Sequence, residues 1–178
     1  MNVRRKRRHV LIPMLREMDT IKGILFDLGG TLIKEGGCEL LGDVVFTLNQ
    51  LKSNYKLGVV SNTDTKTEED VRRILRKLGI EDYFDTVVVS KDIGYRKPDV
   101  RIFSIALERL RLKPEEALMV GNRTDVDIKG GKALGMMTVL IDWNNEPRKE
   151  PLPAEENPTY TINSIDELLK ILQAGRRL

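Results

Sequence analysis

The sequence predicts a single α/β domain built on a three-layer, doubly wound parallel sheet without a cap domain. Short apolar runs alternate along the chain with amphipathic helical segments, which is the order of parallel strands joined by crossover helices. The apolar runs are continuous rather than alternating, as expected for strands that are covered on both faces. The length of 178 residues suits one sizeable core and is too short for two full domains.

The predicted strands are five continuous apolar runs and one shorter edge segment. The first run ends at Asp27 and the Gly29-Gly30 turn, which together mark the end of a buried strand. The six segments are residues 21–26, 57–60, 86–89, 117–120, 137–141 and 160–162.

The predicted helices lie between these runs and show apolar residues at helical spacing. A final helix after the last strand is indicated by a capping box of Ser164 and Glu167, and the proline-rich residues 144–158 are expected to form a surface loop. The other helical segments are residues 41–51, 71–78, 99–112 and 127–135.

Positive charge is concentrated at the beginning of the chain. Residues 1–17 carry six lysine or arginine residues and one glutamate, although the whole chain has a net charge of only +3. We interpret residues 1–18 as a basic N-terminal extension that is disordered or precedes the true start, and residues 19–178 as the folded domain. The extension is also able to contact nucleic acid through phosphate neutralisation, an alternative that we do not favour.

The composition excludes several classes of protein. Cys38 is the only cysteine, so no internal disulfide is possible, and we expect a reducing, cytoplasmic location. No apolar stretch approaches the ~20 residues that a membrane-spanning helix needs. The single histidine, His9, lies in the extension, which leaves the domain without histidine-based catalysis.

Polar side chains follow four of the predicted strands, at the edge of the sheet where such folds bind ligands. They are Asp27, the Ser61-Asn62 pair, Lys97, and a cluster of Asn122, Asp125 and Asp127. Each feature has an ordinary structural explanation, since serine, asparagine and aspartate favour turns and helix caps and a loop lysine is usually solvated. In this order and placement, however, they predict a phosphoryl-transfer site with Mg²⁺, an ion that prefers oxygen ligands.

The motifs around these side chains resemble those of the haloacid dehalogenase (HAD) superfamily. Residues 26–32 (FDLGGTL) resemble its first motif and residues 60–62 (VSN) its second. Residues 94–99 (GYRKPD) resemble the third and residues 120–128 (VGNRTDVDI) the fourth. The resemblance extends over roughly residues 22–142, and four motifs in this order are a specific signal.

This resemblance implies a phosphohydrolase in which Asp27 attacks phosphorus and forms an aspartyl-phosphate. Ser61 and the backbone amide of Asn62 would bind the phosphoryl oxygens, and Lys97 would neutralise the charge on Asp27 and on the phosphate. Thr31 would position the first loop and contribute to phosphate binding. The resemblance also implies a Mg²⁺ ion held by the Asp27 carboxylate, the Gly29 carbonyl, Asn122 and Asp127.

Two departures from the family pattern affect the expected activity. The family's phosphatases carry a second aspartate two residues after the nucleophile, where it protonates the leaving group and activates water; this chain has Gly29 there. The fourth motif has Asn122 where aspartate is usual, which removes one negative charge from the metal site. We therefore expect slow hydrolysis, and a phosphate-binding or scaffold protein with little turnover is the alternative.

A metal-independent dehalogenase is a second alternative. The family's dehalogenases also lack the second aspartate and carry an asparagine followed three residues later by an aspartate, as Asn122 and Asp125 are here. They need a helical cap, however, and only 29 residues separate Thr31 from Ser61. We rank this activity below phosphatase, and without a cap we expect a phosphorylated substrate that is bulky or macromolecular, or closure of the site by another subunit.

Overall fold

The computed structural model describes residues 19–37, 39–144 and 151–175. The predicted basic extension and Cys38 therefore lie outside the described residues, as does part of the predicted loop at 144–158. Across the described part of the chain, no helix combines the length and the apolar character that crossing a membrane would require.

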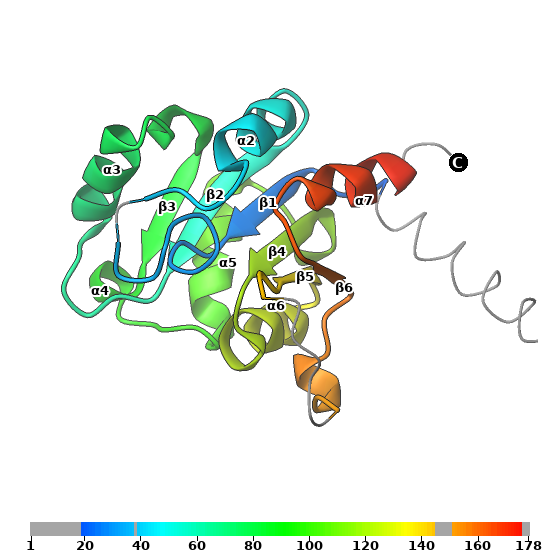
Figure 1. Ribbon diagram of the computed structural model, residues 1–178. Helices are drawn as coiled ribbons and strands as arrows, with labels where there is room; N and C mark the ends of the chain where they lie inside the picture. Colours follow the sequence, from blue (N-terminus) through cyan, green and yellow to red (C-terminus); the bar gives the residue numbers. More distant parts are fainter. Residues whose placement is uncertain (1–18, 38, 145–150, 176–178) are drawn as a thin grey trace, which may run out of the picture.

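Six parallel strands form one sheet in the order β3-β2-β1-β4-β5-β6, which confirms the predicted fold class (Figure 1). The chain extends the sheet in one direction from β1 to β3, then returns to place β4 beside β1 and extends it in the other direction. The strands are β1 (Gly23–Phe26), β2 (Lys56–Ser61), β3 (Thr86–Val89), β4 (Ala117–Gly121), β5 (Met137–Ile141) and β6 (Tyr160–Ile162).

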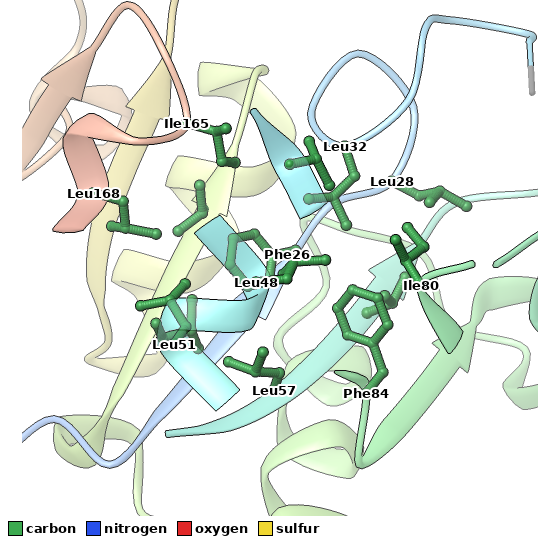
Figure 2. Close-up of a cluster of buried hydrophobic side chains, with 14 of the residues drawn as sticks. Phe26, Leu28, Leu32, Leu48, Leu51, Leu57, Ile80, Phe84, Ile165 and Leu168 are labelled. Atoms are coloured by element: carbon green, nitrogen blue, oxygen red, sulfur yellow. The ribbon is translucent and has the colours of Figure 1, made fainter. Parts of the chain in front are cut away.

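Helices cover both faces of this sheet because successive side chains of each strand point to opposite faces. Ile24 and Phe26 pack in the core beneath α2 (Val44–Lys52), α3 (Glu68–Lys77) and α7 (Glu167–Gly175), and Figure 2 shows this cluster. Leu25 packs on the other face with α5 (Val100–Leu110) and α6 (Lys129–Leu134). The described residues also form the short α4 (Ser90–Ile93), the 3₁₀ turns Glu81–Tyr83, Pro114–Glu116 and Ala154–Glu156, and the π turn Thr124–Ile128.

Local hydrogen bonds place some helix ends away from the predicted positions. The predicted helix at 41–51 begins only at Val44, because the Leu41 amide donates to the Leu32 carbonyl at 3.0 Å and so belongs to the preceding loop. The next helix begins earlier than predicted, because Thr67 and Asp70 form a capping box at its start. Neither hydrogen-bonding contact can be predicted from the spacing of apolar residues along the chain.

The connection between β1 and β2 contains no cap domain in the part that the structure describes. Its described residues form a loop over residues 27–37 and 39–43 and the helix α2, as the short spacing between Thr31 and Ser61 predicts. In Figure 1 this loop lies at one end of the sheet, beyond the end of β1. The carboxyl ends of the central strands therefore face this loop and not a second domain.

Burial in the α2 layer predicts the stability effect of two substitutions on that helix. Leu48 is completely buried, so Leu48→Ala should lower the free energy of unfolding by about 2–5 kcal/mol through lost apolar burial and an unfilled cavity. Phe46 is 56% exposed, and Phe46→Ala should change the free energy by no more than about 0.5 kcal/mol. Urea denaturation measures both, and equal losses would contradict the assigned face of α2.

Candidate active site

A pocket of about 290 Å³ lies at the carboxyl ends of β1, β2 and β4. Asp27 follows β1 directly, and its amide donates to the Val120 carbonyl of β4 at 2.9 Å, so the two strands stay paired up to the site. Six of the side chains predicted from the sequence line this pocket, and so does the predicted Gly29; the six are Asp27, Ser61, Asn62, Lys97, Asn122 and Asp127. The structure thus brings together residues from four separate motifs.

Lys97 bridges two carboxylates inside the protein. Its Nζ donates to Asp27 Oδ1 at 2.5 Å and to the Val60 carbonyl at 2.8 Å, and it lies 2.7 Å from Asp127 Oδ1. The lysine side chain is only 1% exposed. Burial by itself lowers the pKa of Lys97, but the charges of Asp27 and Asp127 outweigh it and raise the pKa, so the ammonium stays protonated.

Asp127 is held against Lys97 by the backbone after β4. Its Oδ2 accepts a hydrogen bond from the Arg123 amide at 3.1 Å. A Cβ at Gly121 would lie 2.4 Å from the Asp127 carboxylate carbon, so only glycine leaves room for this arrangement. Burial raises the pKa of Asp127; Lys97 opposes this shift and the charge of Asp27 adds to it, and the net shift is upward.

Asn62 fixes the backbone of Lys97. Its Nδ2 donates to the Lys97 carbonyl at 2.9 Å, and its Oδ1 accepts from the Lys97 amide at 2.8 Å. Both polar atoms of the Asn62 side chain therefore bond to the backbone of Lys97, and the backbone amide of Asn62 is the group that remains for binding a ligand. The hydroxyl of the neighbouring Ser61, by contrast, makes no hydrogen bond to any residue that the structure describes.

The first loop is anchored on both sides of its glycine pair. Thr31 is fully buried, with its Oγ1 3.1 Å from Asp27 Oδ2 and 3.4 Å from Asn122 Oδ1, and it does not line the pocket. Trp143, after β5, donates from Nε1 to the Gly30 carbonyl at 2.9 Å. The sequence gives no sign of this second contact, because nothing local links two residues 113 positions apart.

The two aspartates of the fourth motif have different surroundings. Asp127 is 1% exposed and faces Lys97, whereas the Asp125 side chain is 55% exposed and forms an ion pair with Arg123 at 2.8 Å. Asp125 does not line the pocket. Of the two carboxylates that the sequence left open, only Asp127 is therefore in a position to act together with Asp27.

A family model described as haloacid dehalogenase-like hydrolase matches residues 33–141. The chain belongs to this family. Its fold agrees with that of a HAD phosphatase from Thermococcus onnurineus, with a TM-score of 0.74 at 24% sequence identity, over 86% of this chain and 99% of that one.

Curated relatives in this superfamily are similar over most of this chain. Glyceraldehyde 3-phosphate phosphatase of Methanocaldococcus jannaschii is 41% identical over 128 residues, which is 71% of this chain and 54% of that protein. Pyrimidine 5'-nucleotidase YjjG of Escherichia coli is 36% identical over 137 residues, 76% of this chain and 57% of that protein. The chain spans about half the length of the curated relatives it matches.

The HAD-type pocket has an oxygen donor set that fits a hard divalent cation. Asp27 and Asp127 with Lys97 leave one net negative charge, and the buried Asp127 Oδ1, although near Lys97, accepts no hydrogen bond of good geometry among the described residues. No cluster of three or more histidine, cysteine, aspartate or glutamate side chains occurs within the described ranges. Mg²⁺ does not need such a cluster, because it is commonly bound by one or two carboxylates together with water and substrate phosphate.

The Lys97 bridge predicts a pH-dependent loss of stability when the ammonium is removed. Lys97→Met leaves two buried carboxylates facing each other, which should cost about 3–5 kcal/mol at neutral pH. Burial and the charge of Asp27 already raise the pKa of Asp127 above its unfolded value, and Lys97→Met removes the ammonium that opposes this shift. The folded state therefore binds the extra proton more readily, and stability returns as the pH falls.

Urea denaturation in chelator, at neutral pH and at about pH 5, measures this effect. Lys66→Met is the matched control, because Lys66 is an exposed residue at the same pocket and should change stability by at most about 0.5 kcal/mol. Equal stability of Lys97→Met and wild type at neutral pH would show that the bridge does not contribute.

Proposed function

We propose that this chain is a Mg²⁺-dependent phosphohydrolase that cleaves phosphate monoesters through an aspartyl-phosphate on Asp27. The observation that carries the proposal is the Lys97 bridge between Asp27 and Asp127. The same pocket contains the hydroxyl of Ser61, which makes no hydrogen bond to any described residue. A buried cation next to a carboxylate nucleophile stabilises the negative charge that accumulates when the nucleophile attacks a phosphoryl group. Because these contacts already hold the Lys97 ammonium beside Asp27, the side chains need to move little during the reaction.

Each of the residues has a distinct role in this mechanism. Asp27 is oriented for attack, because Lys97 holds one carboxylate oxygen and Thr31 the other. Ser61 Oγ and the backbone amide of Asn62 bind the phosphoryl oxygens. A Mg²⁺ ion held by Asp27, the Gly29 carbonyl, Asn122 and Asp127 would neutralise charge on the phosphoryl group.

The substrate is proposed to be a small phosphorylated compound. The names of the relatives refer to glyceraldehyde 3-phosphate and to pyrimidine 5'-nucleotides, both small phosphate esters. The pocket of about 290 Å³ is also near the lower end of the range for small-molecule sites, roughly 300–1,000 Å³. The macromolecular substrate considered from the sequence has no comparable support, since the basic segment that suggested nucleic acid lies outside the described residues.

The two alternatives make different demands on the site. A dehalogenase would use Asp125, which does not line the pocket and forms an ion pair with Arg123. Gly29 and Asn122 favour a phosphate-binding protein with little turnover. Gly29 has no side chain that could transfer a proton, and Asn122 gives the metal site one negative charge fewer than the usual aspartate. Unless another group transfers the proton, esters with poor leaving groups should react slowly.

Removal of the nucleophile or of the metal should abolish hydrolysis of nitrophenyl phosphate. Asp27→Asn replaces the carboxylate with an amide, which is a poor nucleophile towards phosphorus, and excess chelator removes the ion. Release of nitrophenolate with and without Mg²⁺ measures both effects. Full activity in chelator, or chloride release from a haloacid without metal, would contradict the proposal.

A matched pair in the fourth motif separates the phosphatase from the dehalogenase. Asp127→Asn should lower activity by at least roughly tenfold and raise the Mg²⁺ concentration required, since even outer-shell partners of a metal contribute about 10–100-fold. Asp125→Asn should leave both nearly unchanged, because Asp125 is exposed and outside the pocket. Mg²⁺ titrations of the two variants make the comparison, and a larger loss in Asp125→Asn would favour the dehalogenase.

A further inference from the structure

We propose that Glu35 is the general acid and base of this site, acting from the first loop in the space that Gly29 leaves open. The inference rests on the proposed phosphohydrolase function, because it names the group that would move the proton in that reaction. Departure of an alkoxide from phosphorus requires a proton donor close to the leaving oxygen, and attack by water requires an acceptor.

The carboxylate of Glu35 lies where a side chain at position 29 would project. A Cβ built on Gly29 would be 3.2 Å from Glu35 Oε2 and 3.6 Å from Glu35 Cδ, and a Cβ on Gly30 would be 3.0 Å from the same Oε2. An aspartate at position 29 would carry its carboxylate one bond beyond that Cβ. The Glu35 carboxylate therefore occupies almost the same region of the pocket from a different point on the chain.

Glu35 is also the carboxylate that remains free for proton transfer. Three carboxylates line the pocket: Asp27, Glu35 and Asp127. Asp27 and Asp127 both face the Lys97 ammonium, whereas Glu35 has no hydrogen bond or ion pair with any described residue. The adjacent Lys34 does not neutralise it, because Lys34 pairs with Glu39 at 2.8 Å.

A short turn directs Glu35 towards the pocket. The Gly37 amide donates to the Lys34 carbonyl at 3.0 Å, and Gly36 between them has a φ of +65°, a conformation that glycine adopts without strain. The base of the turn is tied down because the Gly30 amide donates to the Ile33 carbonyl at 2.7 Å. These contacts place the carboxylate beside Gly29 although Glu35 itself is exposed.

The proposed steps balance in atoms and protons. Asp27 attacks phosphorus, the bond from phosphorus to the ester oxygen breaks, and protonated Glu35 gives its proton to that oxygen, which leaves as an alcohol. Water then attacks the phosphorus of the aspartyl-phosphate while the Glu35 carboxylate takes a proton from it. The bond between Asp27 and phosphorus breaks, the electron pair returns to the Asp27 carboxylate, and phosphate is released with Glu35 protonated again.

The test compares two esters in Glu35→Gln and in the control Glu39→Gln. Glu39 belongs to the same loop but is 68% exposed and does not line the pocket. With a simple alkyl phosphate, Glu35→Gln should lose about 10²–10⁴-fold in turnover, the usual contribution of general acid and base catalysis. With nitrophenyl phosphate, whose leaving group needs no proton, it should give a rapid burst of about one nitrophenolate per enzyme before slow turnover.

A second substitution keeps the result interpretable. Adding Gly29→Asp to Glu35→Gln should restore a large part of the alkyl phosphate activity, because the new carboxylate enters the region that Glu35 occupied. Glu39→Gln should match wild type on both esters. Melting temperatures of all variants, which should be equal within a few degrees, show that the exposed loop substitutions leave the fold intact.

The possible outcomes distinguish this inference from the proposed function. If wild type cleaves nitrophenyl phosphate and Glu35→Gln cleaves both esters at wild-type rates, the role of Glu35 is wrong and the phosphohydrolase remains. If Glu35→Gln loses both activities equally and higher Mg²⁺ restores them, Glu35 binds metal and the inference is also wrong. If wild type releases no nitrophenolate at all, the proposed function and the role of Glu35 are both overturned.

Discussion

The contacts of Lys97 set a strict geometric condition on the rest of this domain. A buried ammonium is tolerated only if opposite charges and hydrogen-bond acceptors surround it, and here Asp27, Asp127 and the Val60 carbonyl do so. Asp27 directly follows β1, Asp127 lies in the turn after β4, and Val60 belongs to β2. The Lys97 ammonium is therefore neutralised only if the three strands end at the same edge of the sheet and Asn62 holds the backbone of Lys97 in place.

The sheet topology explains why this condition can be met. β1 and β4 are neighbours in the sheet, but the chain leaves them towards opposite edges, so a crevice opens at their carboxyl ends. Asp27 and Asn122 flank this crevice, and Gly121 allows the Asp127 carboxylate to approach the backbone more closely than any side chain would permit. The same arrangement that buries Leu25 and Phe26 in two cores thus leaves the next residue, Asp27, facing a pocket.

The first loop gives this member of the HAD-like hydrolase family its individual character. In place of a cap, the described part of the connection has a short loop anchored by Trp143 and a turn that carries Glu35 to the pocket. If Glu35 transfers the proton, the function of a side chain at position 29 has passed to a residue six positions further along the chain. A catalytic group defined by its location in space can change its sequence position when the backbone folds back on itself.

The sequence alone determined the fold class, the six strands within one or two residues, the described connection without a cap, and seven of the residues that line the pocket, since these depend on apolar periodicity and on motifs at strand ends. The roles of the predicted site residues and of Mg²⁺ remain predictions. Only the tertiary structure decided that Asp127 and not Asp125 faces Lys97, that Trp143 holds Gly30, and that Glu35 lies beside Gly29. These contacts join residues through turns and packing between distant segments, and neither spacing nor periodicity encodes which side chain a turn directs into a pocket.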